Sequence, residues 1–484
     1  MEWHEALILL IGCMLLLMAI GLPVALAFFG VNIVGAYLFL GGETGLLQLT
    51  RNSLASLASF TLAPIPLFLL MGEILFHTGI AFRAIDAVDK LILRIPGRLS
   101  IVTILGGTLF SSLSGSTLAN TAVLGSVLLP DMLKRGYHPS IAMGPIMATG
   151  GIAMLIPPSA LAVLLGSLAG VSITKLLIAG ILPGLMMSVL HLGYVILRCY
   201  LNPNLAPVYE SENLSLWQRI WPFLKYVVPL FSIFVLVVGS ILAGWATPTE
   251  SAAIGCMGAF LISIFYRSLS FSALQKALLE TAKVSSMILF IIVASVTFSQ
   301  ILAFSGATDG LLKTIQEIAT SQFTILLMMI SVLLILGAFM DQVSMVMITI
   351  PFFIPLAQFQ EIDLLWLCVL MLIVMEISFT TPPFGLLLYV MKGVAPKEIT
   401  LRQIYLAALP FIMLEFLVLI YLIIEPNTDL YLQSLIFNHL LFLKGVEQLA
   451  FQGFQIQTLI ILVVFLLFQK TYYYSSILIY FFNI

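Results

Sequence analysis

The sequence predicts an all-α polytopic membrane protein built from two inverted repeats. Three observations lead to this fold class. The composition is strongly apolar, many apolar runs are long enough to cross a bilayer, and a pattern of prolines recurs after 225 residues, as between Pro23 and Pro248.

The composition identifies lipid as the solvent of this chain. Of 484 residues, 61% are hydrophobic and 9% are charged, and the mean hydropathy is +1.16. Soluble domains are about 45–50% apolar and about 25% charged. The net charge of −2 gives no support for nucleic-acid binding, so the expected surroundings are a lipid bilayer and no nucleic acid.

The apolar runs predict helices rather than barrel strands. A helical span needs about 20 apolar residues, and about ten or more spans fit this chain. A barrel strand alternates apolar and polar residues, whereas runs such as 233–242 and 325–336 are apolar on nearly every side. Further candidate spans begin in the runs 6–18, 24–40, 226–242, 252–265, 288–304 and 364–375.

The proline pattern divides the chain into two halves. At the same offset, Pro130 corresponds to Pro355, and Pro157-Pro158 to Pro382-Pro383. Internal repeats are common in transporters. The expected organisation is a first repeat (1–200), a polar cytoplasmic linker (201–225), a second repeat (226–426) and an atypical C-terminal extension (427–484).

Each repeat contains the same elements in the same order. Two apolar helices joined by a proline-containing turn come first, and a third helix and a short amphipathic stretch follow. Next come a segment interrupted by small and polar residues, expected to be a re-entrant hairpin, and a helix broken at the double proline. The hairpins are expected at about 101–130 and 324–358, and the broken helices at about 146–170 and 364–391.

Charge predicts that the two repeats are inverted. The amphipathic stretch of the first half carries Arg83, Lys90, Arg94 and Arg98, whereas that of the second half carries only Lys313 as a basic residue. Because basic residues accumulate on the cytoplasmic side, the first stretch is expected inside and the second outside.

The double prolines predict helices that unwind within the membrane. Each proline removes a backbone donor and clashes with the preceding turn. The freed carbonyl groups are hard oxygen ligands suited to a sodium ion. Such backbone survives only where protein or a water-filled cavity covers it. A simple kink is the alternative interpretation.

Polar residues at the centres of the two hairpins supply further oxygens. Ser114, Ser116 and Asn120 do so in the first hairpin, and Gly337 and Asp341 in the second, where Gln342 and Ser344 follow. The alternative for the small residues is close helix packing.

Asp341 is the sharpest of these signals, because an acid within the bilayer costs several kcal/mol unless it is paired or binds a cation. Thr380 and Thr381 are its expected partners in a second ion site. Glu376 is an alternative, although a position near a helix end explains it equally well. Glu73 and Glu415 are interpreted as lone structural or interfacial acids.

Motifs of other protein classes are missing from the sequence. It has no HExxH, GxSxG, Walker A or GxGxxG context, and its five histidines are scattered. The chain is therefore expected not to be an enzyme. The four cysteines have no CxxC spacing and are interpreted as apolar packing residues.

Several stretches resemble the large membrane subunit of tripartite ATP-independent periplasmic (TRAP) transporters, the DctM type. They are GEILFHTGIAFRAIDAV, SGSTLANTAVLGSVLLPDMLKRGY, MATGGIAMLIPPS, ATPTESAAIG and TTPPFGLLLYVMKGVA. The resemblance covers roughly residues 1–426. The extension at 427–484 departs from the family pattern.

The resemblance implies an elevator-type transporter that imports a small organic acid, similar to a C4-dicarboxylate, together with sodium and without another cofactor. It implies a bacterial inner-membrane location, a small four-helix membrane subunit and a periplasmic solute-binding protein as partners. Carried onto this chain, it places sodium at Ser114, Ser116, Asn120, Gly150 and Pro157, and at Gly337, Asp341, Thr380, Thr381 and Pro382. It places the substrate near Ser114 and Ser159.

Two alternatives remain at this point. The first is a stand-alone sodium/dicarboxylate symporter with similar inverted repeats. The second is a membrane subunit of an ion-pumping enzyme complex, which would need Lys, Glu and His residues across the midplane, whereas the lysines here lie at loop positions.

Overall fold

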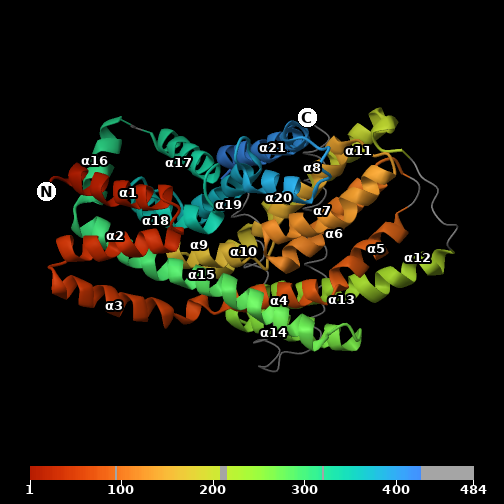
Figure 1. Ribbon diagram of the computed structural model, residues 1–484, viewed down its shortest axis with the longest axis horizontal. Helices are drawn as coiled ribbons and strands as arrows, with labels where there is room; N and C mark the ends of the chain where they lie inside the picture. The colour runs from red at the N-terminus through yellow and green to blue at the C-terminus, as the bar shows by residue number, and fades with distance from the viewer. Residues whose placement is uncertain (93–94, 208–214, 319–320, 427–484) are drawn as a thin grey trace, which may run out of the picture. The chain divides into compact units, whose positions relative to one another are not determined.

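The computed structural model describes residues 1–92, 95–207, 215–318 and 321–426, with side chains at 112–114 and 316–318 excluded. The regular secondary structure of these ranges is helical (Figure 1). This confirms the expected all-α membrane fold. The prediction for the extension at 427–484 lies outside the described residues.

The helices of the first half include the two arms of the first hairpin and the two parts of the first broken helix. In chain order they are α1 (Trp3–Ala19), α2 (Val24–Phe39), α3 (Glu43–Leu57), η1 (Phe60–Leu62), α4 (Pro64–His77), α5 (Ile80–Leu91), α6 (Arg98–Ser114), α7 (Thr117–Lys134), α8 (Pro139–Gly151), η2 (Ile152–Met154), α9 (Ala160–Ala169), α10 (Ile173–Ala179), α11 (Ile181–Leu201) and η3 (Pro203–Leu205).

The second half repeats much of this order. Its helices are α12 (Leu216–Pro222), the π-helical turn η4 (Phe223–Val227), α13 (Val228–Leu242), α14 (Pro248–Phe265), α15 (Phe271–Phe304), α16 (Ala307–Ile318), α17 (Gln322–Gly337), α18 (Gln342–Phe359), α19 (Leu364–Thr380), α20 (Leu386–Val394) and α21 (Leu401–Ile424).

Seven helical segments of the described chain are long and apolar enough to cross a membrane. Others, including α1, α2, α9, α17 and α19, are apolar but shorter. The ten or more spans expected from the sequence include helices of both groups. Several apolar runs are arms of hairpins or halves of broken helices rather than complete spans.

The helix boundaries recur at the offset that the prolines indicated. The arms α7 and α18 both have 18 residues and begin 225 residues apart, at Thr117 and Gln342.

One difference between the halves has a clear cause. Pro64 begins α4, because proline favours the first turn of a helix. The position 225 residues later is Leu289, and there α15 continues for 34 residues.

Local sequence explains both hairpin turns. Gly115 separates α6 from α7 with φ +61°, a left-handed conformation that glycine adopts at little cost. The hydroxyl of Ser116 then caps α7 by accepting a hydrogen bond from the backbone of Ala119. In the second hairpin, the carboxylate of Asp341 caps α18 by accepting from the backbone of Ser344 at 3.1 Å.

Both broken helices are interrupted where the sequence predicts. In the first, α8 ends at Gly151 and α9 begins at Ala160. In the second, α19 ends at Thr380 and α20 begins at Leu386. The first helix begins at Pro139, earlier than expected, because proline suits the first helical turn and His138 caps it.

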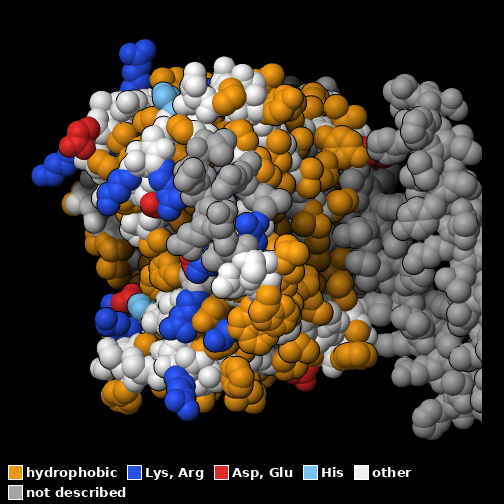
Figure 2. Space-filling view, turned by 90° about the vertical axis from the view of Figure 1, so that its right-hand side faces the viewer, with side chains coloured by type: hydrophobic (Ala, Val, Ile, Leu, Met, Phe, Trp, Pro, Cys, Tyr) orange, Lys and Arg blue, Asp and Glu red, His pale blue; other side chains and the backbone are white. Residues whose placement is uncertain are grey.

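The amphipathic helices α5 and α16 lie towards opposite ends of the view in Figure 1. Figure 2 faces the end at which α11 and α12 lie, and there Lys and Arg side chains gather between apolar areas. Arg198 and Arg219 belong to these two helices. This charge distribution is typical of a cytoplasmic face.

Candidate functional site

The tip of the first hairpin lies against the break of the first broken helix. A Cβ placed on Gly115 would be 3.7 Å from the carbonyl oxygen of Pro158 and 4.0 Å from the backbone nitrogen of Ala160. Ser159, between them, is buried and caps α9 through a 3.2 Å hydrogen bond from Ala162. The side chain of Ser114 lies outside the described residues. Ser116 and Ser159 are thus both capping residues at this junction.

Asn120 connects the second arm of this hairpin to the first arm and to α8. Its side-chain nitrogen donates to Ser111 Oγ at 2.9 Å and to the carbonyl oxygen of Thr149 at 3.3 Å. Ser111 Oγ in turn donates to the same Thr149 carbonyl at 2.6 Å. These three residues are fully buried, so hairpin and broken helix meet through a polar cluster within an apolar core.

Gly150 completes this cluster. A Cβ at Gly150 would overlap Thr121 Oγ1 and would lie 3.2 Å from the carbonyl oxygen of Thr117. Within the described chain, Asn120 Oδ1 and Thr121 Oγ1 are buried oxygens without a hydrogen-bond partner. An unpartnered buried polar atom costs about 1–3 kcal/mol, so this grouping of oxygens is suited to a bound cation or water.

Of the five residues expected at the first sodium site, Asn120 and Gly150 belong to this polar cluster. Ser116 and Pro157 instead belong to the turn and the break beside it. Ser114 ends α6.

The second hairpin approaches the second broken helix at Gly337. A Cβ there would overlap both Oγ and Cβ of Ser378 on α19. The hydroxyls of Thr380 and Thr381 both donate to the carbonyl oxygen of Ile377, at 3.0 and 2.6 Å. The close approach of hairpin and broken helix is therefore present in this half as well.

Asp341 is half-buried and acts as the cap of α18, through the backbone and hydroxyl of Ser344. In the part of the chain described here, its hydrogen bonds do not reach Thr380 or Thr381. The hydroxyls of Thr380 and Thr381, the expected partners of Asp341, instead donate to the backbone carbonyl of Ile377 in this conformation.

The second half also contacts the break of the first broken helix. The side-chain amide of Gln342, at the tip of the second hairpin, lies 3.0 Å from Met154 Sδ in the break of the first broken helix. Helix α18 also packs against α9, and α19 packs against both η2 and α9. The first break therefore lies between the tips of both hairpins.

Some of the backbone oxygens at the second break accept hydrogen bonds. The backbone nitrogen of Gly385 donates to the carbonyl oxygen of Thr381 at 3.1 Å, and Tyr405 donates to the carbonyl of Pro383 at 2.8 Å. Gly385 has no space for a side chain, because a Cβ would lie 2.5 Å from the carbonyl oxygen of Phe379. Pro382 belongs to this turn.

Glu415 is placed differently from its interpretation in the sequence, whereas Glu376 lies near the C-terminal end of α19, as one of its two interpretations has it. Glu415 is not a lone acid: it is fully buried, and its Oε1 lies 3.6 Å from Nε2 of the equally buried His191. Glu376 is buried against Gly151, where a Cβ would overlap its carboxyl group. Glu73 is partly exposed and lies 3.3 Å from His77, in agreement with a structural or interfacial role.

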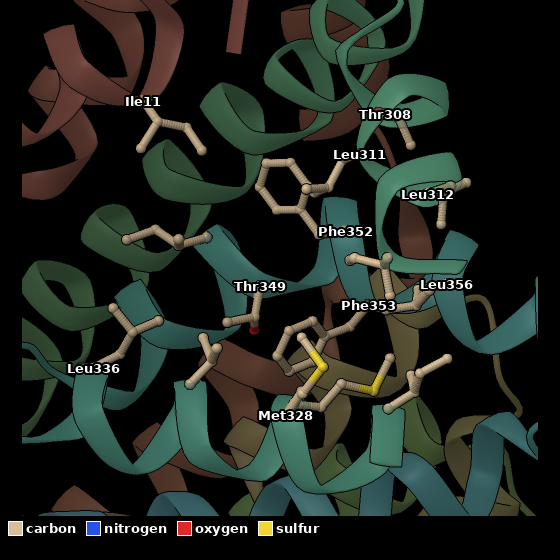
Figure 3. A pocket seen from close by; sticks show the side chains of 15 residues that line it. Ile11, Thr308, Leu311, Leu312, Met328, Leu336, Thr349, Phe352, Phe353 and Leu356 are labelled. Atoms are coloured by element: carbon tan, nitrogen blue, oxygen red, sulfur yellow. The ribbon is translucent and has the colours of Figure 1, made fainter. Parts of the chain in front are cut away.

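A separate pocket has a volume of about 320 Å³ and lies among α1, α16, α17 and α18 (Figure 3). Leucine, isoleucine, methionine and phenylalanine side chains dominate its walls, and its hydroxyl groups come from Thr308 and Thr349. An anion needs several convergent polar donors. The pocket is therefore unsuited to an organic acid.

The residues that sequence reasoning missed are Ser111, Thr149 and Ser378. Other hydroxyl-bearing residues lie close to Ser111 and Ser378, at Ser112 and Thr380, so neither is distinctive in the sequence, and Thr149 lies between an alanine and a glycine. The only signal was that Ser111 and Asn120 are nine residues apart, on opposite arms of an expected hairpin.

Comparisons with known proteins agree with this architecture. A family model described as the tripartite ATP-independent periplasmic transporter, DctM component, matches residues 11–428. The C4-dicarboxylate TRAP transporter large permease protein DctM of Pseudomonas aeruginosa is 32% identical over 82% of this chain and 93% of that protein. The 2,3-diketo-L-gulonate TRAP transporter large permease protein YiaN of Escherichia coli is 30% identical over 87% of this chain and 97% of that protein.

A solved structure supports the fold alone. The YdaH transporter of Alcanivorax borkumensis matches 82% of this chain and 90% of its own, with a TM-score of 0.57 and 15% sequence identity. The relatives identified by sequence are permeases rather than enzymes. Sequence, helix order and the extent of the family match all lead to one assignment: this multi-pass membrane protein belongs to the DctM component family, the large subunits of TRAP transporters.

Proposed function

We propose that this chain is the large transmembrane subunit of a sodium-coupled TRAP transporter in the bacterial inner membrane. It imports a small organic acid, similar to a C4-dicarboxylate, that a periplasmic binding protein delivers. A small four-helix membrane subunit completes the transporter.

The observation that carries the sodium proposal is the pair of unpartnered oxygens beside Gly150. Asn120 Oδ1 and Thr121 Oγ1 are buried there without a hydrogen donor among the described residues. The carbonyl oxygens of Thr149 and Gly150 end a helix at the same place. A helix C-terminus carries partial negative charge, and neutral hard oxygens suit an alkali cation.

A second sodium site is proposed at the tip of the second hairpin. Its ligands would come from Gly337, Asp341, Thr380, Thr381 and Pro382. The contact between Gly337 and Ser378 supports it, because this contact brings the hairpin next to the turn that contains these threonines. Asp341 supplies the negative charge near this turn.

The proposed mechanism is an elevator movement of two inverted repeats. The separation of α5 and α16 in Figure 1 supports opposite orientation of the halves. The contact between Gln342 and Met154 supports a transport domain in which both hairpin tips and both breaks form one unit. In this proposal the unit carries substrate and sodium together across the membrane.

The substrate is proposed to bind beside the first hairpin tip, near Ser114 and Ser159. Ser159 lies in the break that the tip contacts. Relatives named for a C4-dicarboxylate and for 2,3-diketo-L-gulonate support an organic acid as cargo. The carboxylate would receive hydrogen bonds from hydroxyl and backbone donors at this tip.

The test is uptake of radiolabelled succinate into proteoliposomes that contain this chain and its small subunit. Uptake is expected only with both an inward sodium gradient and the binding protein. Uptake that is indifferent to sodium, when the binding protein and substrate are matched, contradicts the proposal. Sodium-dependent uptake by this chain alone favours the stand-alone symporter instead.

A further inference from the structure

The buried pair His191 and Glu415 has no role in the transport scheme described above. His191 lies ten residues from each end of α11, and Glu415 lies nine residues before the end of α21. At 1.5 Å per residue, His191 is about 15 Å from either end of its helix. Because a bilayer core is about 30 Å thick, the pair lies deep within the membrane.

Both side chains are isolated from water. His191 and Glu415 are each 0% exposed, and Nε2 and Oε1 are 3.6 Å apart. The ring of Phe411 packs edge-on against the imidazole, with centroids 5.3 Å apart. Within the described chain, both imidazole nitrogens and both carboxylate oxygens have no hydrogen-bond partner.

We propose that His191 and Glu415 form an intramembrane proton-binding site that holds one proton at neutral pH. With one proton, the pair has no net charge. Loss of this proton would leave a carboxylate among apolar side chains, at a cost of several kcal/mol. A second proton would leave an equally unfavourable isolated cation.

The proton resides on the Glu415 carboxyl. A buried ion pair is favourable only when its geometry is good and further hydrogen bonds satisfy its remaining polar atoms. The separation of 3.6 Å is long for a charge-assisted hydrogen bond, and the described residues make no additional hydrogen bonds to the polar atoms of this pair. The neutral carboxylic acid beside a neutral imidazole is therefore the favoured form.

The surrounding helices supply one further buried acid. Glu376 lies on α19, which packs against α21, and its side chain is also buried. The other titratable groups on the described helices packed around the pair, or on the residues that cap those helices, are Arg98, His138, Lys175, Tyr194, Arg198, Cys199, Tyr200, Asp363, Cys368, Tyr389, Lys392, Arg402, Tyr405, Tyr421 and Glu425.

Of these groups, Tyr194 and Arg198 are nearest to His191 along α11. They bond to each other, and the Tyr194 ring packs on Phe411. The Arg198 guanidinium is therefore engaged by the Tyr194 side chain.

The test is infrared spectroscopy of the purified full chain in lipid nanodiscs at neutral pH, which requires no transport activity. The wild type is expected to show the carbonyl-stretch band of a buried protonated carboxylic acid. Glu415→Gln should remove its contribution, and His191→Gln should shift it. Glu73→Gln is the matched control, because Glu73 also lies near a histidine but is 20% exposed; it should leave the band unchanged.

An unchanged carbonyl-stretch band in Glu415→Gln overturns the proposal. The proposal is also overturned if the Glu415 band of the wild type appears only when sodium is removed, because the site would then bind sodium. If Glu415→Gln does not fold, wild-type spectra recorded from neutral to alkaline pH decide the question. A buried acid band that persists to alkaline pH and is perturbed in His191→Gln supports the site. A band lost by neutral pH contradicts it. These outcomes are independent of sodium-coupled uptake, which can fail or succeed separately.

Discussion

The side-chain amide of Asn120 donates a 2.9 Å hydrogen bond to Ser111 Oγ, across the two arms of the first hairpin. The same nitrogen reaches the carbonyl oxygen of Thr149 on the broken helix. One buried amide therefore holds together three helices and leaves its own oxygen free of protein donors in the described structure.

Replacement of Asn120 by alanine should weaken both folding and sodium binding. It removes a potential ligand oxygen and leaves Ser111 and Thr149 with fewer partners, at about 1–3 kcal/mol. We expect a lower unfolding temperature in detergent and a sodium requirement for uptake that is about tenfold higher, equivalent to about 1.4 kcal/mol. A variant with wild-type sodium dependence would exclude Asn120 from the site.

Gly150→Ala should close the first site without removing any polar group. The new Cβ would overlap Thr121 Oγ1, and overpacking of this kind costs about 1–3 kcal/mol. Uptake as a function of sodium concentration should show weaker activation. Gly239→Ala is the control, because nothing lies within 4 Å of a Cβ at Gly239; equal effects of the two changes would refute a specific role.

Gly337→Ala should separate the second hairpin from α19, because its Cβ would overlap Ser378 Oγ and Cβ. The compensating change Ser378→Gly removes both overlapping atoms. In a double-mutant cycle of unfolding temperatures, the second change should restore much of the loss caused by the first. Simple addition of the two losses would show that the contact is absent.

A short thiol-reactive cross-linker should join cysteines introduced at Met154 and Gln342, since the ends of the two native side chains are in contact at 3.0 Å. The measurement is a mobility shift after cross-linking, with the four native cysteines replaced by alanine. Ser331, exposed on α17, supplies the control when it is paired with Met154. Cross-linking of the control pair alone would contradict the described arrangement of hairpin tip and break.

Much of the fold could be predicted, because its main determinants are local. A double proline interrupts a helix wherever it stands, and a glycine followed by a capping serine makes a turn between two helices, as at Gly115 and Ser116. The departures were also local: Pro64 separates α3 from α4, whereas Leu289 lets α15 continue.

The polar contacts of the site could not be predicted from sequence. Ser111 and Thr149 are 38 residues apart, and His191 and Glu415 are separated by most of the second half. Neither spacing has a helical or hairpin signature, so only tertiary packing brings these groups together. Asp341 shows the same limit: the sequence predicts an acid near the hairpin tip, but not that its carboxylate accepts a hydrogen bond from the backbone of Ser344 and caps α18.

The most direct test of the account is the binding of radioactive sodium to the purified chain, without substrate or partners. We expect saturable sodium binding by the wild type and by Gly239→Ala, and binding about tenfold weaker in Asn120→Ala, the change expected when about 1.4 kcal/mol is lost. Absence of saturable sodium binding in the folded wild type, or equal affinity in Asn120→Ala and Gly239→Ala, would contradict the proposed sodium site beside Gly150.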